Sequence, residues 1–340
     1  MQTGLWRSRL WPLTSRRLQA SSRPILVGCF RGEVGFEALY WIPFLRRLMK
    51  RYRIAPERLI PITRGGAFVW YGGGIPGGLL ETPQRLDLYD LRTPQQVRVE
   101  NRVQHQKHQQ LKQIVVSPFD RQVLRDAAKQ LKLTRYHVLH PAWMYARLAP
   151  FFASAMSLAD LEQECLFETI PTPMLPDDVK LPVPFIAVRF YFRHTFPPHP
   201  HLVSFAQESI KQMATTAAVV LLNSGVHADE HQDLQMPDHP NVYRLTDLCP
   251  ITPQNNLAVQ SAVLGRALGF VGTYGGIAQL ALRLGRPSVS YYHEWSGTAI
   301  AHKHLTDALA LKQGLPCLVL KVGELPLLQS VVPTLQLTPA

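Results

Sequence analysis

The order of apolar segments along the chain is the feature that most limits its fold. Short apolar runs typical of strands alternate with longer segments whose apolar residues recur at three- and four-residue spacing. Residues 25–30 form such a run, and residues 36–48 carry the helical pattern that follows it. Alternation of this kind is typical of a parallel sheet covered by helices. The sequence therefore predicts an α/β protein.

A proline-rich stretch, residues 171–184, separates two groups of predicted elements. The predicted strands are residues 25–30, 59–63, 67–71, 112–116 and 136–139, then 185–192, 218–222, 242–245, 269–271 and 288–292. The predicted helices are residues 36–48, 119–131, 142–152, 201–214, 256–268 and 277–284. A length of 340 residues fits two domains.

These elements give five predicted regions. We expect a basic N-terminal arm at residues 1–24, a first Rossmann-like domain at 25–170 and a linker at 171–184. A second Rossmann-like domain is expected at 185–322 and a C-terminal tail at 323–340.

Basic residues are concentrated near the N-terminus. The net charge is +12, and residues 1–53 hold eleven Arg and Lys against two Glu, which leaves +3 for the rest. A nucleic-acid groove would distribute basic and aromatic residues over the fold, so nucleic acid is the weaker interpretation. A basic N-terminal edge suits an anionic membrane surface or an acidic partner. Residues 1–23, rich in Arg and free of acids, also resemble a transit peptide or a solvated arm without a role.

Two further features bear on the setting. Cys29, Cys165, Cys249 and Cys317 lie far apart and lack the spacing of a zinc site, so we expect a reducing compartment and no structural disulfide. No apolar run reaches the ~18 residues that a membrane span needs. The expected location is the cytoplasm, either free or peripheral on the inner face of the cytoplasmic membrane.

A glycine-rich segment at residues 272–276, GTYGG, separates a predicted strand from a predicted helix. Free N–H groups and the positive dipole end of that helix make an anion site that fits a diphosphate. The segment lacks the GxGxxG spacing and the Lys-Ser/Thr of a P-loop, which disfavours dinucleotide and ATP sites. The alternative is a tight turn that needs glycine only for its backbone geometry.

Residues 255–292 resemble the donor-binding half of GT-B glycosyltransferases, in which two helices, a short strand and a glycine-rich turn hold a nucleotide sugar. The chain is most similar to bacterial glycosyltransferase-like proteins that pair a GEVGFE-type loop, here residues 32–37, with a VGTYGG turn, here residues 271–276. It resembles heptosyltransferases and the O-fucosyltransferase-like group more distantly, and it lacks the DSGxxH-like turn of heptosyltransferases. The order of elements agrees over most of residues 25–310.

The resemblance implies a GT-B-like fold, with two Rossmann-like parallel-sheet domains facing across a cleft. It also implies that the N-terminal domain binds the acceptor, that the C-terminal domain binds the donor and that no metal is obligatory. The sequence contains no DxD triplet to hold a divalent ion. Asp177 and Asp178 lie in the linker, and the histidines near residues 194–201 lack metal-ligand spacing.

Polar residues and glycines in the second half are candidates for donor contacts, because ligands bind at the carboxyl ends of parallel strands. The candidates are Arg189, Arg193, Asn223, Ser224, Gly225, Thr246, Asn255, Gln260, Gly272, Thr273, Tyr274, Gly275 and Gly276. A guanidinium pairs with phosphate in fork geometry. Arg193 could equally be a surface residue, and the amides could equally be helix caps.

Two glutamates are the catalytic candidates. Inverting transfer needs a general base within hydrogen-bond reach of the acceptor hydroxyl. Glu33 is preferred because Gly32 and Gly35 bracket it in the first strand–helix loop. Glu37, one helical turn later, is the alternative, although it could merely complement the helix dipole. A retaining enzyme would not need this base.

The sequence thus predicts a metal-independent, inverting glycosyltransferase without a cofactor. It would move a sugar from a nucleotide sugar to a saccharide or lipid-linked hydroxyl in cell-surface polysaccharide assembly. The alternatives are a sugar-nucleotide epimerase of similar architecture and a catalytically inactive GT-B-like binding or scaffold protein. A dinucleotide oxidoreductase is disfavoured, because the acidic residue expected about 20 positions after GxGxxG is missing.

Overall fold

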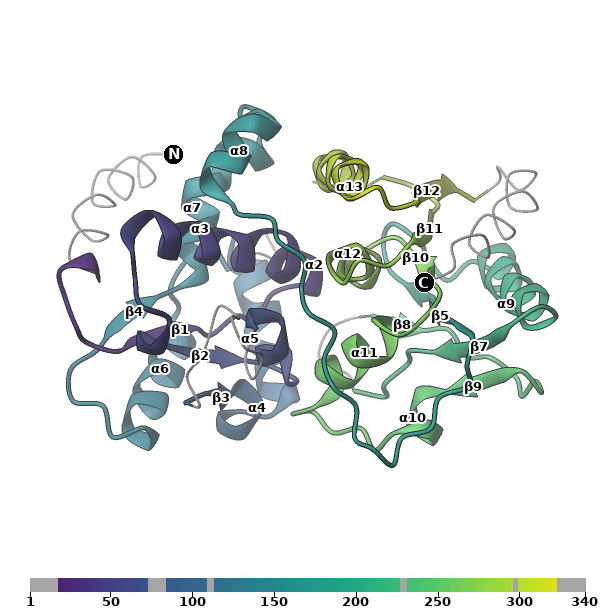
Figure 1. Ribbon diagram of the computed structural model, residues 1–340, viewed down its shortest axis with the longest axis horizontal. Helices are drawn as coiled ribbons and strands as arrows, with labels where there is room; N and C mark the ends of the chain where they lie inside the picture. Colours follow the sequence, from purple (N-terminus) through teal and green to yellow (C-terminus); the bar gives the residue numbers. More distant parts are fainter. Residues whose placement is uncertain (1–17, 73–83, 109–112, 227–230, 296–298, 323–340) are drawn as a thin grey trace. The chain divides into compact units, whose positions relative to one another are not determined.

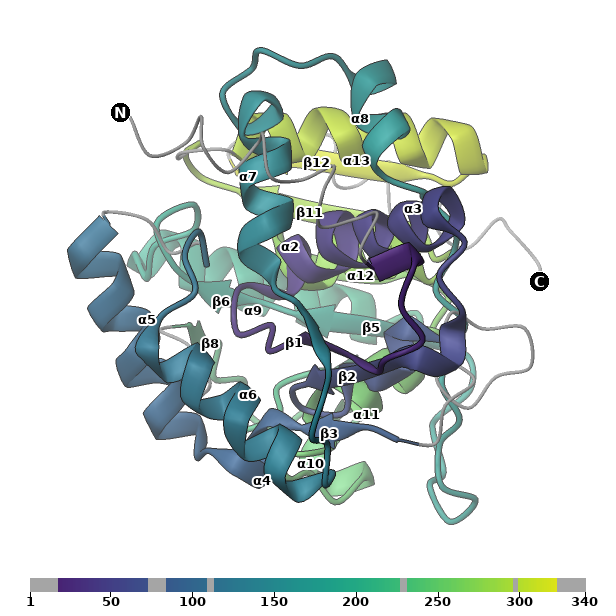
Figure 2. The same cartoon turned by 90° about the vertical axis from the view of Figure 1, so that its left-hand side faces the viewer.

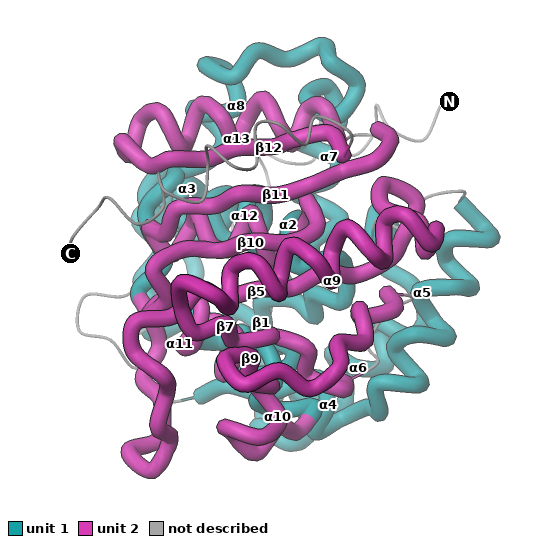
Figure 3. Tube along the Cα trace, turned by 90° about the vertical axis from the view of Figure 1, so that its right-hand side faces the viewer, with its two compact units in different colours: residues 1–171, 253–258 teal, residues 172–252, 259–340 magenta. Residues whose placement is uncertain are grey.

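The chain forms two compact units, shown in different colours in Figure 3. The computed structural model describes residues 18–72, 84–108, 113–226, 231–295 and 299–322. Unit 1 comprises Met1–Pro171 and Pro253–Ala258, and unit 2 comprises Thr172–Thr252 and Val259–Ala340. Each unit is built on one parallel sheet, so the predicted α/β class with two Rossmann-like sheets is confirmed. The cleft expected between the two domains stays a prediction.

Unit 1 contains a four-stranded sheet in the order β3-β2-β1-β4. Its strands are β1 (Ile25–Gly28), β2 (Leu59–Thr63), β3 (Leu86–Asp87) and β4 (His137–Leu139). All neighbouring strands are parallel. Every residue of β1 and β2 is buried, which explains why both read as continuous apolar runs.

The helices of unit 1 lie on both sides of this sheet. They are α2 (Val34–Phe36), the π-helical turn η1 (Glu37–Trp41), α3 (Ile42–Tyr52), the 3₁₀ turns η2 (Pro56–Arg58) and η3 (Ala67–Tyr71), α4 (Leu88–Leu91), α5 (Pro94–His108), α6 (Pro118–Gln130), α7 (Pro141–Phe152) and α8 (Leu158–Glu164). Figures 1 and 2 show α3 and α7 on the opposite side of the sheet from α4 and α6. Phe44, Leu45 and Leu48 of α3 are buried, as their helical spacing predicts.

Unit 2 contains a six-stranded parallel sheet in the order β12-β11-β10-β5-β7-β9. Its strands are β5 (Phe185–Arg189), β7 (Ala218–Leu221), β9 (Val242–Arg244), β10 (Phe270–Thr273), β11 (Ser288–Tyr292) and β12 (Cys317–Lys321). A separate antiparallel pair joins β6 (Tyr191–Phe192) to β8 (Gln232–Asp233). The predicted strand 185–192 is therefore two strands, interrupted at Phe190.

Five helices lie wholly or mainly in the described part of unit 2, α11 beginning in the unit 1 segment Pro253–Ala258. They are α9 (Pro200–Ala214), α10 (Leu245–Leu248), α11 (Asn256–Leu264), α12 (Gly276–Arg283) and α13 (Ala299–Gln313). Helix α9 runs across one face of the sheet (Figure 3). Leu202 and Ile210 of this helix belong to one apolar core with Ile186, Val219 and Val271 of the strands. Burying such side chains contributes about 1.5–3 kcal/mol each.

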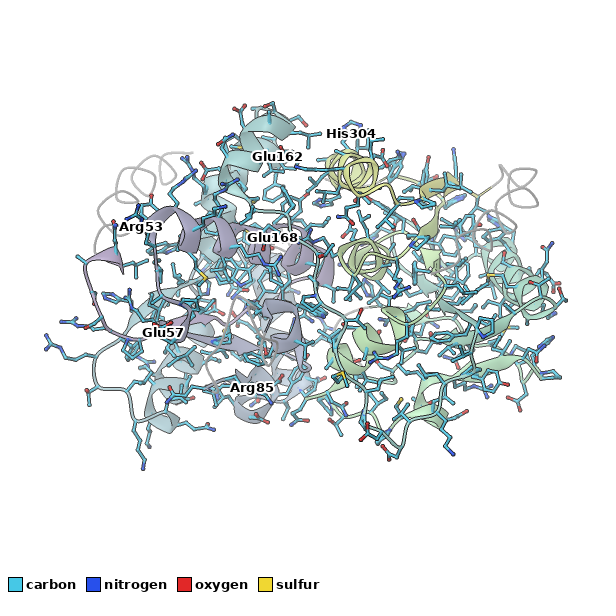
Figure 4. All side chains as sticks on the ribbon, viewed as in Figure 1. Arg53, Glu57, Arg85, Glu162, Glu168 and His304 are labelled. Atoms are coloured by element: carbon cyan, nitrogen blue, oxygen red, sulfur yellow. The ribbon has the colours of Figure 1, made fainter. Side chains whose placement is uncertain are left out.

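Arginines of α3 cap the end of α8. Arg47 donates to the carbonyls of Glu162 and Cys165, and Arg51 donates to the carbonyl of Gln163. The last carbonyls of a helix lack intrahelical partners, and cations are favourable there. Arg46 likewise donates to the carbonyl of Glu168 at 2.8 Å. Figure 4 labels Glu162 at α8 and Glu168 beside α3. Part of the basic N-terminal region thus holds unit 1 together.

Two predicted strands are wrong. Residues 67–71 form the 3₁₀ turn η3, because Gly66 and Gly72 at its two ends adopt positive φ of 75° and 80° and end any extended run. Residues 113–116 form no strand, since this segment runs into the N-cap of α6 at Ser117, and residue 112 lies outside the described residues. Helix α5 was not predicted, because its sequence is polar and only Val97 is buried.

The described residues contain no helix that is both long and apolar enough to cross a membrane. All four cysteines are free thiols, and Cys29, Cys165 and Cys249 are buried.

Candidate functional site

The strand order of unit 2 brings β5 and β10 together at a switch point. Numbered along the unit, its six strands lie in the order 6-5-4-1-2-3, which is the order of doubly wound nucleotide-binding folds. Ligands of such folds bind outside the carboxyl ends of the two strands at the switch point. Arg189 ends β5, and Gly272, which pairs with it in register, lies one residue before the end of β10.

The glycine turn after β10 is accessible only at its last two residues. Gly272, Thr273 and Tyr274 are buried, whereas Gly275 and Gly276 are half-buried. The Thr273 hydroxyl donates to the carbonyl of Tyr191 and accepts from its N–H, both at 3.0 Å. This hydroxyl therefore attaches β6 to β10. The backbone of Gly275 and Gly276 is the part of the turn that a ligand can approach.

Close approach explains why two of these positions are glycine. Gly275 has a φ of 164° and a ψ of −151°, an extended conformation that any residue can adopt. A Cβ atom at Gly275 would overlap the hydroxyl of Tyr191. A Cβ atom at Gly272 would overlap the backbone carbonyl of Arg189. The structural alternative proposed for this turn therefore applies to Gly272, which is enclosed by backbone.

Helix α12 begins directly after the turn. Gly275 is its N-cap residue, and no side-chain hydrogen bond caps the helix there. The first N–H groups of a helix have no intrahelical acceptor, and they lie at the positive end of the dipole. An uncapped helix start beside accessible glycine backbone is an arrangement that can bind an anion.

Arg189 belongs to a polar network at this switch point. Its Nε donates to Asp233 Oδ1 at 3.0 Å, and its Nη1 donates to Gln260 Oε1 at 3.0 Å. Its guanidinium also lies 5.7 Å from the ring centroid of Tyr191. The structure thus brings two predicted donor-binding residues, Arg189 and Gln260, into direct contact and adds Asp233, which sequence reasoning missed.

Arg193 lies just beyond β6. Its backbone pairs with Phe196 in a tight turn, and its Nη1 contacts His231 Nε2 at 2.9 Å. The His231 ring in turn lies against Tyr191, with centroids 4.4 Å apart. Arg193 is therefore linked to Gly275 through the side chains of His231 and Tyr191.

The remaining donor candidates have local structural roles. Asn223 donates to the carbonyl of Leu234 at 2.9 Å, and the Ser224 hydroxyl accepts from the N–H of Val226 at 3.3 Å. Gly225 has a φ of 69°, which allows the turn after β7.

Thr246 and Asn255 lie outside the β5–β10 switch point. Thr246 is exposed in α10, after the edge strand β9. Asn255 belongs to the segment Pro253–Ala258 of unit 1. The sequence indicated Thr246 by its position after a strand and Asn255 by its position beside the helix before the glycine turn, without knowledge of the strand order.

Unit 1 has its own switch point, between β1 and β4. The loop after β1 carries Glu33, which is half-buried at the start of α2. A Cβ atom at Gly32 would lie 3.5 Å from the hydroxyl of Tyr145. Burial and then the charge of Glu33 raise the pKa of Tyr145. Glu33 therefore lies near a buried phenol at the edge where ligands bind.

A buried network fixes the start of this loop. Arg31 donates from Nε to Asp120 Oδ1 at 2.9 Å, and its side chain also contacts Asn101. Gln113 donates to Asp120 Oδ1 at 3.1 Å and accepts from the Arg31 N–H at 3.2 Å. Asp120 is fully buried at the capping box of α6. The loop thus leaves β1 from a rigid polar anchor.

His140 completes this network from the end of β4. Its Nδ1 accepts the N–H of Ala142 at 3.1 Å, so the ring proton is on Nε2, 3.3 Å from Asp120 Oδ2. Burial alone would raise the pKa of Asp120. The hydrogen bond from His140 and the charge of Arg31 outweigh it and hold that pKa far below the usual range.

Glu37, the second catalytic candidate, is completely buried at the first residue of η1. Its Oε1 accepts the hydroxyl of Tyr71 at 2.8 Å, and its Oε2 lies 3.7 Å from Arg64 Nη2. Burial raises the pKa of Glu37 to about 7, although Arg64 and Tyr71 oppose the shift. A carboxylate without surface exposure cannot meet an acceptor hydroxyl directly, so the geometry favours Glu33 as the general base.

No group of three or more His, Cys, Asp or Glu side chains in the part of the chain that is described could hold a metal ion. The rings of His199 and His201 lie parallel on the surface with centroids 5.7 Å apart. The expected independence of the reaction from a metal stays a prediction.

Solved structures of glycosyltransferases are among those to which the chain is similar. One is the glycosyl transferase family 9 protein of Veillonella parvula, at 12% identity and a TM-score of 0.42, covering 95% of this chain and 91% of that chain. Another is the E. coli heptosyltransferase WaaC with ADP, at 12% identity and a TM-score of 0.44, covering 88% and 93%. E. coli ADP-heptose LPS heptosyltransferase II shows 13% identity and a TM-score of 0.37 over 86% and 99%.

No protein-family model matches the sequence, and no curated protein matches it. Heptosyltransferases are also among the families that the sequence motifs resemble.

Proposed function

We propose that this protein is a glycosyltransferase that moves a sugar from a nucleotide sugar to a hydroxyl of a saccharide or lipid-linked acceptor. One observation carries the proposal. At the switch point of unit 2, the accessible backbone of Gly275 and Gly276 leads into the uncapped start of α12. This is the place and the chemistry that a nucleoside diphosphate requires.

In the proposed reaction, the N–H groups at the start of α12 stabilise the leaving diphosphate as its charge develops. Arg193 adds a guanidinium that pairs with a phosphate oxygen. Glu33 removes the proton from the acceptor hydroxyl, and the sugar inverts at its anomeric carbon. Arg189, ion-paired with Asp233, orients Gln260 and Tyr191 around the donor. The reaction needs no divalent metal, since the helix and the guanidinium supply the positive charge.

A nucleotide screen tests the donor site first. We expect one nucleoside diphosphate or its sugar conjugate, among those of adenine, guanine, uracil and thymine, to raise the melting temperature. A ligand at 100 times its Kd adds about 2.7 kcal/mol to the free energy of unfolding. The same shift is expected with EDTA present. Absence of a shift with every nucleotide would contradict the proposal, and a shift seen only with added Mn²⁺ or Mg²⁺ would contradict its metal independence.

A second prediction concerns Gly275. Gly275→Ala is expected to weaken binding of the nucleoside diphosphate identified in that screen about tenfold, or about 1.4 kcal/mol, as measured by calorimetry. The new methyl group overlaps the Tyr191 hydroxyl, so the variant also loses stability. Tyr191→Phe removes that hydroxyl, which leaves the ring carbon Cζ at 3.2 Å as the nearest atom.

The double variant separates the two effects. Gly275→Ala combined with Tyr191→Phe is expected to recover stability while binding stays weak, because the ligand still meets the methyl group. The single variant Tyr191→Phe is the reference for both measurements. If the double variant binds as tightly as Tyr191→Phe alone, Gly275 serves only to make room for Tyr191, and the phosphate-binding role is wrong.

The finer points of the proposal concern the setting. We place the reaction in the cytoplasm, in cell-surface polysaccharide assembly, with acceptor binding in unit 1 and donor binding in unit 2. Membrane association through the basic N-terminal region stays a prediction. A truncation that tests it should remove residues 1–17, because Arg58 anchors the carbonyls of Leu18 and Arg23 to unit 1.

A further inference from the structure

Arg64 has a place in unit 1 that the sequence did not indicate. It follows the last residue of β2, and β2 is paired in parallel with β1. Its side chain therefore starts beside the loop that leaves β1. The Nη2 of Arg64 donates to the carbonyl of Gly32, the residue before Glu33. The side chain of Arg64 is 8% exposed, so this contact is shielded from water.

The same nitrogen atom also faces Glu37. Glu37 Oε2 lies 3.7 Å from Arg64 Nη2 and has no hydrogen-bond partner among the described residues. A fully buried carboxylate oxygen without a hydrogen bond is costly, and so is a buried guanidinium. Tyr71 donates to the other oxygen and holds the carboxylate in one orientation. Glu37 and Arg64 thus keep each other in place inside unit 1.

We propose that Arg64 is a positioning residue for Glu33. The buried pair with Glu37 fixes the guanidinium, and the guanidinium fixes the Gly32 carbonyl and with it the orientation of the Glu33 side chain. Glu37 then acts in the reaction without touching a substrate, which accounts for a carboxylate buried four residues after Glu33. The inference rests on the proposed function, in which Glu33 is the general base. The contact between Arg64 and the Gly32 carbonyl does not depend on that function.

The positions of the two glutamates support this assignment. The N–H of Glu37 donates to the carbonyl of Glu33 at 3.2 Å, so Glu37 and Glu33 lie in one helical turn. η1, which starts at Glu37, is π-helical, a local distortion that is frequent at functional sites. Arg31 holds the other end of the loop through Gln113 and Asp120. Glu33 therefore follows two main-chain positions held by buried side chains, at residues 31 and 32, and precedes the buried carboxylate of Glu37.

The experiment measures backbone order and turnover separately. In Arg64→Met, amide hydrogen exchange of the peptide containing residues 29–37 is expected to be at least about tenfold faster than in the wild type. Acceptor-dependent kcat is expected to fall about 100-fold, since small misplacement of a catalytic group has effects of this size. The Kd of the nucleoside diphosphate is expected to stay within twofold, because unit 2 is unchanged.

Arg46→Met is the matched control. Arg46 is as buried as Arg64, donates to the carbonyl of Glu168 and lies 3.7 Å from the carboxylate of Glu168, but it serves the segment after α8. Its loss should affect stability without accelerating exchange in residues 29–37 or lowering kcat beyond twofold. Equal effects of the two variants on that peptide and on kcat would overturn the proposal.

Arg64→Lys guards against a variant that does not fold. Lysine keeps the charge beside Glu37, but its nitrogen is one bond closer to Cα than Arg64 Nη2, the atom that makes both contacts, so it reaches Gly32 and Glu37 less well. A folded Arg64→Lys protein is expected to show intermediate exchange and intermediate kcat, and wild-type values for both would refute the positioning role. If Arg64→Met accelerates exchange but the wild-type protein turns over no nucleotide sugar, the contact is confirmed and the proposed function is wrong. Failure of the positioning role is therefore distinguishable from failure of the proposed function.

Discussion

Asp120→Asn is expected to lower the free energy of unfolding by about 3–5 kcal/mol, the range for breaking a buried ion pair. Asp120 has no exposed surface, and its carboxylate faces Arg31, His140 and Gln113 at once. An amide cannot balance the charge of Arg31, and its NH₂ group would confront a donor. Urea unfolding at neutral pH measures this loss.

The pH dependence of the free energy of unfolding tests the same ion pair. The native pKa of Asp120 lies below the value near 3.9 of an unfolded aspartate. Its contribution to stability is therefore complete above about pH 4 and is lost as the pH falls toward the native pKa. The difference in stability between wild type and Asp120→Asn should shrink below about pH 4. A difference that grows on acidification would contradict the ion pair.

Asp126→Asn is the control on the same helix. Asp126 pairs with Arg92 at 2.5 Å, but its side chain is 34% exposed. Solvent-exposed ion pairs contribute about 0–1 kcal/mol. The control should therefore lose less than about 1 kcal/mol. A loss equal to that of Asp120→Asn would show that burial is not what makes the Asp120 network important.

Gly272→Ala is expected to cost about 3 kcal/mol, at the upper end of what overpacking costs. The added Cβ atom would overlap the Arg189 carbonyl and lie 2.7 Å from its carbon. Both atoms belong to the backbone of a neighbouring central strand, so neither can rotate away. Because β5 and β10 define the switch point, a methyl group that pushes these two strands apart should also weaken nucleotide binding. Urea unfolding and calorimetry on the same samples measure the two effects.

Gly285→Ala is the matched control. Gly285 has a φ of 71°, and a Cβ atom there meets nothing within 4 Å. Its substitution therefore carries only the strain of a left-handed conformation, about 1–2 kcal/mol. If Gly272→Ala costs no more than Gly285→Ala, the close approach of β5 and β10 is not a constraint on this sequence.

Much of the architecture could be predicted from local patterns. The ends of β2 and β11 agree with the predicted strands, because β2 is an apolar run and β11 consists of Val, Tyr and Ser. The error at residues 67–71 had a physical cause, since an apolar run of five residues fits a strand and a buried 3₁₀ turn equally well. Only Gly66 and Gly72 distinguish the two, and their positive φ values are not visible in the sequence.

The candidate site was less predictable, because its partners are far apart in the chain. Arg31 and Asp120 are 89 positions apart, and Arg189 and Gln260 are 71 apart. No spacing rule connects such pairs. Strand order, which decides that β10 rather than β9 lies beside β5, also depends on the fold as a whole. Glu33 and the glycine turn were identifiable because each is a local strand-to-helix loop.

The arginines of α3 change how the basic composition of this chain should be interpreted. All three of them, Arg46, Arg47 and Arg51, donate to main-chain carbonyls at and after α8, so they cap this helix and anchor the segment that follows it. A lysine would keep the charge but has one nitrogen, whereas Arg51 uses Nη2 for the Gln163 carbonyl and Nη1 for the Glu164 carboxylate. Selection for folding alone would thus retain arginine here. In this chain, part of the excess of basic residues near the N-terminus serves to cap the end of α8. That excess is therefore a poor guide to whether the protein binds a polyanion, and to which one.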